Sequence, residues 1–288
     1  MYNKFLEYLL QNEPEKTISQ TGITLRRIMN PVVRKVLPLS TKTELKIIRR
    51  EKMPNAPVIF AATHGFQEDI VDTLLIADRL AYILIGSLSQ IFYSMDGIVA
   101  WIAGMILVDR MDQESRKAAK EKMIRVLKMG VSIIIFPEGT WNKSPNQMVS
   151  GLFPGVYDVA MATGAPIVPV ATHREGKYVY GILDKGFDIT KYERQQGISF
   201  LRDRMATLRW ELMEIDSFAT RDEFPYGERA DVYWTNYIDK LMTEVEFYDY
   251  EIELNTKYVD KLAATPEEVF AFMKNIQLTK NNAFLWRQ

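Results

Sequence analysis

The chain has 288 residues, of which 47% are hydrophobic, so it can bury the core of one large domain or of two modest ones. It contains no cysteine and two histidines, His64 and His173, which excludes disulfides, thiolate metal ligands and a cysteine nucleophile and argues against a metal site. The net charge of −1 gives no overall attraction to nucleic acid or to an anionic membrane, so no nucleic-acid partner is expected and membrane binding requires a local patch.

Residues 1–54 are expected to form an N-terminal amphipathic helical region. Apolar side chains recur at helical spacing over 2–11 and again over 25–36, and Pro31 should kink the second helix or break it in two. Four basic side chains lie off the second apolar stripe: Arg26, Arg27, Arg34 and Lys35. Such a segment suits contact with a membrane surface, and the alternative is an ordinary helix that packs its stripe on its own protein and exposes the basic face.

Residues 55–190 are expected to form an α/β core. Short apolar runs predict strands at 58–62, 82–85, 105–108, 131–136 and 167–170, in addition to an earlier strand at 45–48. Helical patterns lie between them at 68–79, 113–129 and 156–163, and 91–102 is helical or irregular. Asp112 is the expected N-cap of one helix and Gly130 its stop. This alternation predicts a largely parallel sheet flanked by helices.

Residues 191–288 are expected to form a helical C-terminal extension packed on the core. One helical stripe contains Leu201, Met205, Leu208 and Leu212. A strong helix start follows at residues 265–268, where a threonine N-cap precedes a proline and two glutamates.

The most apolar region, residues 80–108, is divided by Asp96, whereas a spanning helix needs roughly 20 apolar residues without charges. Charged residues such as Lys4 and Glu7 interrupt any apolar signal core near the N-terminus. We therefore expect neither a transmembrane span nor a signal peptide.

Ligands of parallel α/β sheets bind beyond the carboxyl ends of the strands. The loops after residues 62, 108, 135 and 170 are therefore the places to search, and they are expected to hold His64, Arg110, Glu138 and His173.

His64 and Asp69 are the first candidate pair. Five residues along a helix span about 500°, so the two side chains can meet only if His64 lies in the loop and Asp69 in the first helical turn. Gly65 permits that turn. A carboxylate bonded to one imidazole nitrogen makes the other a better general base. The alternative is a histidine in an ordinary turn and an acid that satisfies a helix terminus.

Two further loops offer groups for an anion or a hydroxyl ligand. Residues 136–140, with the sequence Phe-Pro-Glu-Gly-Thr, follow a buried strand and present Glu138 and Thr140, although such a segment can also be only a turn. Arg110 ends another strand and suits a phosphate, or else forms a surface salt bridge with Asp109 or Asp112.

Together these motifs, with Pro166-Ile167-Val168-Pro169 after them, closely resemble the glycerolipid acyltransferase family, which includes the 1-acylglycerol-3-phosphate (lysophosphatidate) acyltransferases. The resemblance covers roughly residues 55–172. It implies that His64 and Asp69 form a catalytic dyad. It also implies that the phosphate end of the acceptor is held by Arg110, Glu138, Gly139 and Thr140. The segment 166–169 corresponds to a block associated with the acyl donor or with the shape of the site.

The chain departs from the family pattern at two positions. The family usually has arginine just after the Pro-Glu-Gly-Thr run, where this chain has Trp141, and commonly has lysine near 153–155, where it has Pro154. Lys143 and Arg174 are the candidate replacements for the lost phosphate contacts.

The resemblance implies an acyltransferase that moves a fatty acyl group from an acyl thioester to the hydroxyl of a lysophospholipid such as 1-acylglycerol-3-phosphate. The donor would be acyl-CoA or acyl-carrier protein, with no bound cofactor and no acyl-enzyme. Such a protein would be cytoplasmic and would bind the cytoplasmic face of the membrane peripherally. The rivals are a thioesterase or lipid esterase that uses the same dyad and a non-catalytic lipid-binding protein.

Overall fold

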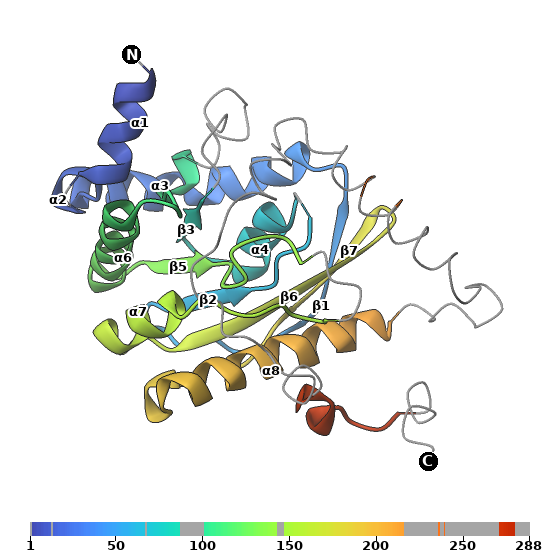
Figure 1. Cartoon of the computed structure of the whole chain (residues 1–288). Helices are drawn as coiled ribbons and strands as arrows, with labels where there is room; N and C mark the ends of the chain where they lie inside the picture. Colours follow the sequence, from blue (N-terminus) through green and yellow to red (C-terminus); the bar gives the residue numbers. More distant parts are fainter. Residues whose placement is uncertain are drawn as a thin grey trace.

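The computed structural model describes residues 2–12, 14–66, 68–86, 101–142, 147–215 and 271–279 and the single positions 236 and 239. These residues form a seven-stranded sheet in the order β1-β7-β6-β2-β5-β3-β4, with helices on both faces (Figure 1). The strands are β1 (Glu44–Arg50), β2 (Ile59–Ala62), β3 (Ala81–Ile85), β4 (Met105–Leu107), β5 (Ser132–Ile135), β6 (Ile167–Glu175) and β7 (Tyr178–Leu183).

The helices occur before, between and after the strands. They are α1 (Tyr2–Gln11), α2 (Pro14–Thr17), α3 (Gln20–Val36), α4 (Asp69–Ala77), α6 (Gln113–Lys128), α7 (Gly155–Thr163) and α8 (Arg194–Met213). Short 3-10 helices are η1 (Leu37–Ser40), η3 (Ile189–Lys191) and η4 (Ala271–Asn275). Asp112 caps α6 as expected, since its carboxylate accepts the main-chain N–H groups of Glu114 and Ser115.

The sheet is largely parallel, as predicted. β2 pairs in parallel with β5 and β6, and β3 pairs in parallel with β4 and β5. Only the β6–β7 pair is antiparallel among the described strands, and β1 then joins β7 in parallel at the edge. The carboxyl ends of β2, β4 and β5 therefore meet at one edge, where the loops carrying the candidate residues begin.

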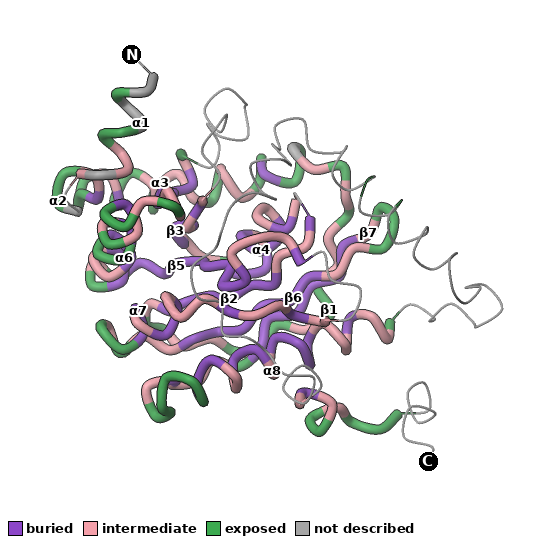
Figure 2. The backbone as a smooth tube through the Cα atoms, in the orientation of Figure 1, coloured by how far each residue is buried: buried purple, intermediate pink, exposed green. Residues whose placement is uncertain are grey.

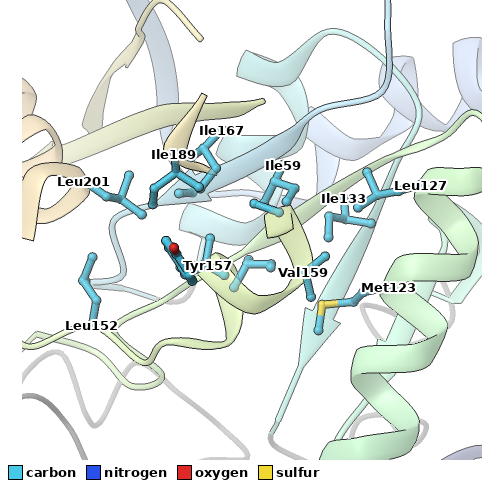
Figure 3. Close-up of a cluster of buried hydrophobic side chains, with 14 of the residues drawn as sticks. Ile59, Met123, Leu127, Ile133, Leu152, Tyr157, Val159, Ile167, Ile189 and Leu201 are labelled. Atoms are coloured by element: carbon cyan, nitrogen blue, oxygen red, sulfur yellow. The ribbon is translucent and has the colours of Figure 1, made fainter. Parts of the chain in front are cut away.

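The core lies on both faces of the sheet because side chains alternate along each strand. In β2, Ile59 and Ala61 join the cluster formed with α6, α7 and α8, whereas Phe60 and Ala62 join the cluster beneath α4. Figure 2 shows the buried inner strands of the sheet, of which β2 and β5 are buried along their whole length, whereas the edge strand β1 is not. Figure 3 shows the first cluster, in which sheet isoleucines meet side chains from the covering helices, including Met123, Leu127, Val159 and Leu201.

The segments at the two ends of the core are attached to it by specific contacts. Lys122 of α6 donates to the main-chain oxygens of Leu9 and Leu10, where α1 ends. β1 lies within residues 1–54, yet it is the edge strand of the sheet. At the other end, α8 packs Leu208 and Leu212 against strands β6 and β7.

The structure corrects three expectations. His173 does not lie in a loop: β6 continues to Glu175 because it pairs antiparallel with β7, and His173 is opposite Tyr180. Of the kink or break expected at Pro31, the break does not occur, because α3 runs unbroken from Gln20 to Val36. The apolar stripe of α3 is not packed in the core. Its exposed members and their exposed fractions are Leu25 at 55%, Ile28 at 70%, Val32 at 62% and Val36 at 48%.

Several expectations lie outside the described residues: most of the segment 91–102, Lys143 and the helix start at 265–268. None of the helices in the described part of the chain is both long and apolar enough to cross a membrane.

Candidate active site

The side chains of His64 and Asp69 meet in the structure. His64 lies in the loop after β2, and Asp69 is the first residue of α4. The Nδ1 atom of the imidazole is 3.0 Å from Asp69 Oδ2 and 3.1 Å from Oδ1. The carboxylate is fully buried, whereas the His64 side chain is 16% exposed. With Nδ1 turned to the carboxylate, the second ring nitrogen, Nε2, remains as the proton acceptor for a ligand.

Asp69 also shapes the loop that carries His64. Its Oδ2 atom accepts the main-chain N–H of Gly65 at 2.7 Å and that of Phe66 at 3.2 Å. Two amide donors, the imidazole and the start of a helix all favour the ionised carboxylate. The negative charge that orients the imidazole is therefore stabilised by the same turn that positions it.

Glu138 anchors the His64 loop from a neighbouring strand. The main-chain N–H of His64 donates to Glu138 Oε1 at 3.0 Å. Glu138 Oε2 accepts the Ser150 N–H at 2.8 Å and the Ser150 hydroxyl at 3.0 Å. The carboxyl is fully buried, and this burial raises its pKa, an effect that the nearby Arg209 guanidinium and these hydrogen bonds oppose. Both oxygens of Glu138 therefore bind protein groups.

The other side of the His64 main chain is also fixed. Its carbonyl oxygen accepts the N–H of Asn142 at 2.7 Å. The side-chain amide of Asn142 in turn donates to the main-chain oxygens of Gln147 and Met148 at 2.8 and 3.2 Å. Two aromatic rings border the imidazole: Phe136, with ring centroids 4.5 Å apart, and Trp141, edge-on at 6.2 Å. The histidine is thus held by its backbone, its carboxylate and its ring neighbours.

Arg110 and Gly139 also come together, as expected of loops at one sheet edge. The Arg110 guanidinium donates to the Gly139 carbonyl. Gly139 has a φ of +71°, and a Cβ at this position would lie 2.5 Å from the Phe153 ring, so only glycine fits the turn. Gly86 likewise leaves room for Arg110, whose Nε would be 2.8 Å from a Cβ there. Thr140, next in the turn, is partly exposed.

Of the two candidate replacements for the lost phosphate contacts, Arg174 and Lys143, the structure describes only Arg174. Arg174, near the end of β6, lies 3.5 Å from Glu68, the residue that precedes α4, and also donates to the Gly176 carbonyl at 3.1 Å. It therefore lies on the α4 side of the dyad. Lys143 is not among the described residues. His173, the other histidine, has its Nε2 atom 3.9 Å from Glu175.

Arg209 on α8, a residue that the sequence did not indicate, lies beside the loop that carries His64. Its Nη1 atom donates to the Met148 carbonyl at 2.9 Å, and Nη2 would lie 3.7 Å from a Cβ placed on Gly65. Among the described residues, Nη2 has no hydrogen-bond acceptor. No motif marks Arg209, because only the packing of α8 brings this distant part of the chain to the His64 loop.

This arrangement supports proton abstraction by an oriented histidine from a hydroxyl or from water. A group of His, Asp and Glu side chains that could hold a metal ion does not occur in the part of the chain that the structure describes. The groups in place are the His64–Asp69 pair, Arg110 in the loop after β4, and Arg209 on α8.

Comparisons with known proteins confirm the family resemblance. Residues 44–173, just under half of the chain, match the family model described as Acyltransferase. The chain is 29% identical over 171 residues to the 1-acyl-sn-glycerol-3-phosphate acyltransferase of Haemophilus influenzae, a match that covers 53% of this chain and 67% of that protein. It is 26% identical over 152 residues to the chloroplastic 1-acyl-sn-glycerol-3-phosphate acyltransferase BAT2 of Brassica napus, a match that covers 50% of this chain and 42% of that protein.

The chain thus spans less than half the length of the plant protein. Among solved structures, it is similar to the 1-acyl-sn-glycerophosphate (LPA) acyltransferase PlsC of Thermotoga maritima, with a TM-score of 0.52 and 18% identity over 75% of this chain and 90% of that one. At this identity the likeness concerns the fold alone.

Proposed function

We propose, from the acyltransferase-family match of residues 44–173 and the contact between His64 and Asp69, that this protein transfers a fatty acyl group from an acyl thioester to the hydroxyl of a lysophospholipid such as 1-acylglycerol-3-phosphate. The donor is acyl-CoA or acyl-carrier protein. The observation that carries the proposal is the dyad, because a buried carboxylate on Nδ1 equips the other imidazole nitrogen to act as a general base.

The reaction proceeds without an acyl-enzyme. His64 removes the proton of the acceptor hydroxyl while the hydroxyl oxygen attacks the thioester carbonyl. Asp69 stabilises the imidazolium that forms. The tetrahedral adduct then collapses, the carbon–sulfur bond breaks, and the imidazolium returns the proton to the departing thiolate. The products are a new ester and a free thiol.

The oxyanion of that adduct needs a hydrogen-bond donor. The amides of His64, Gly65, Phe66, Gly139 and Asn142 already donate within the protein. We assign the donor to Arg209. Its Nη2 atom lies beside Gly65, and the N–H groups of this atom donate to no acceptor within the described part of the chain. We assign binding of the acceptor's phosphate to the Arg110 side chain and to the turn at Gly139 and Thr140. Glu138 instead positions the His64 loop.

A membrane-facing surface accompanies the site. The exposed apolar stripe of α3 is flanked by the exposed basic residues Arg27 and Lys35. The other two basic residues of α3 are engaged with the protein: Arg26 donates to the Trp101 carbonyl at 3.0 Å, and Arg34 pairs with Asp78. An apolar face with basic edges favours docking on an anionic bilayer, where lysophospholipids reside.

Mass-spectrometric analysis of products tests the proposal. The purified protein is incubated with acyl-CoA or acyl-carrier protein donors and with mixed lysolipids, and thiol release is followed in parallel. A diacyl product that requires acceptor supports acyl transfer. Thiol release that is equally fast without acceptor, and yields free fatty acid, identifies a thioesterase instead. Binding of lipid without either product identifies a non-catalytic lipid-binding protein.

A further inference from the structure

A second aspartate, Asp72, lies behind the dyad without a hydrogen-bonding partner for its buried oxygen. It follows Asp69 by three residues on α4, so the two carboxyls lie on neighbouring turns of one helix face. Asp72 is 1% exposed, and its Oδ2 atom has no hydrogen-bond partner among the described residues. Asp69, by contrast, accepts hydrogen bonds from two main-chain amides and faces the His64 imidazole.

The charges around Asp72 are mostly of its own sign. The pKa of Asp72 is raised to about 7, first by burial and then by the neighbouring charges of Asp69 and Glu68, whereas Arg174 on β6 opposes the shift. β1 and β7 also pack on α4, and the charged side chain that reaches the helix from β1 is Arg50. Arg50 lies at the C-terminal end of α4, where it donates to the Leu75 carbonyl and to the Asp78 carboxylate.

A structural role does not account for this carboxyl. A buried polar atom without a partner costs about 1–3 kcal/mol, and an apolar residue at this position would continue the buried face that Leu74 and Ile76 form nearby. Strained or unpaired groups of this kind concentrate at functional sites. Asp72 is buried on α4 three residues after Asp69, and Asp69 is the carboxylate that contacts His64, so a role of Asp72 in the dyad is exerted through Asp69.

We propose that Asp72, buried beside Asp69 with an unpartnered oxygen, is a positioning residue for the dyad, whose charge sets how strongly Asp69 attracts the imidazole. This inference rests on the proposed base role of His64. When Asp72 is neutral, the buried negative charge of the pair belongs to Asp69, which has the donors to stabilise it. When Asp72 ionises, a second negative charge favours the imidazolium that forms during attack.

The direction of the effect follows from the charges. Removal of the second negative charge makes the imidazolium that forms during attack less stable, so His64 is a weaker base. The variant Asp72→Asn should therefore match wild type at the acid end of the profile, where Asp72 is neutral in wild type as well, and should lower kcat about threefold to tenfold at the alkaline end, where wild type carries the second charge. The acceptor KM should stay within about twofold, because Asp72 does not touch the substrate.

The experiment compares full-length wild type, Asp72→Asn, Asp72→Leu and Asp78→Asn between pH 5.5 and 9. Asp78 is a matched control because it follows the same helix but is exposed and paired with Arg34 and Arg50. Infrared difference spectra of each protein report the protonated carboxyl directly and need no activity. Wild type and Asp78→Asn should lose a buried carboxylic acid band near pH 7, and both Asp72 variants should lack it. Asp72→Leu serves if Asp72→Asn fails to fold.

The outcomes separate the two proposals. If no protein transfers or hydrolyses acyl groups, the proposed function fails, and the infrared titration alone then decides the charge of Asp72. If the band does not titrate, or if it titrates while the Asp72→Asn rate profile superimposes on that of wild type, Asp72 does not set the dyad and the inference is overturned.

Discussion

The main-chain N–H of His64 donates to the side chain of Glu138, 74 residues away, at 3.0 Å. This bond joins the loop after β2 to the loop after β5 at the shared edge of the sheet. It gives Glu138 a role in positioning the histidine, since both carboxyl oxygens bind protein groups.

We expect Glu138→Gln to disturb this anchor. The amide can still accept the His64 N–H, but its NH₂ group then faces the N–H of Ser150, so a buried donor loses its acceptor. The free energy of unfolding should fall by about 1–3 kcal/mol, and kcat should fall because the histidine is misplaced. Denaturant unfolding and steady-state kinetics measure both effects. Glu175→Gln, on an exposed side chain that the dyad does not use, is the control.

Both members of the dyad should be needed for transfer. His64→Ala removes the base and should lower kcat by about 10²–10⁴-fold, and Asp69→Asn should approach this loss because it removes the charge that orients the imidazole. Product formation and thiol release are measured together for each variant. Full activity of His64→Ala would rule out the dyad mechanism while leaving the fold assignment intact.

Arg209→Gln tests the assignment of the oxyanion donor. Loss of one such donor typically lowers kcat about 10²–10³-fold, and the KM values should change little because the charge develops only in the transition state. Arg194→Gln is the matched control: it lies on the same helix, and its exposed guanidinium pairs with Asp158 at 3.0 Å. If Arg209→Gln raised only the KM of the phosphorylated acceptor, Arg209 would be a phosphate ligand instead.

The exposed stripe of α3 should bind anionic vesicles. Charges introduced by Ile28→Glu and Val32→Glu lie at positions that are 70% and 62% exposed, so they should weaken binding without loss of core packing. Cosedimentation with phosphatidylglycerol-containing vesicles measures the bound fraction, and Lys117→Glu on α6 controls for a change of net charge. Equal binding by the double variant and wild type would place the membrane contact elsewhere.

The stability of the protein should depend on the protonation of Asp72. Its pKa rises from 3.8 to about 7 on folding, so the folded state binds the proton more tightly, and wild type loses stability as pH rises from 3.8 through 7. Asp72→Asn lacks this loss. Relative to wild type it should therefore gain roughly 2–3 kcal/mol between pH 5 and pH 8.5. Urea unfolding at the two pH values measures the gain. If the free energies of unfolding of Asp72→Asn and wild type differed by the same amount at both pH values, the prediction would be wrong.

The sequence by itself determined the alternation of strands and helices up to residue 170, the largely parallel character of the sheet, and the three loops that hold His64, Arg110 and Glu138, whereas it did not predict β7. Local signals suffice for these features: apolar runs of strand length, the Asp112 cap, and the spacing that lets His64 and Asp69 meet across a strand-to-helix turn. The family motif in residues 44–173 is of the same local kind.

Only the tertiary structure decided the remaining features, because each depends on which element packs against which. β6 extends through His173 because β7 pairs with it, and the α3 stripe is exposed because no described element covers it. Glu138 faces inward to His64, and Arg209 arrives on α8. Asp72 looks like an ordinary acid in a first helical turn until burial removes the water that would stabilise its charge.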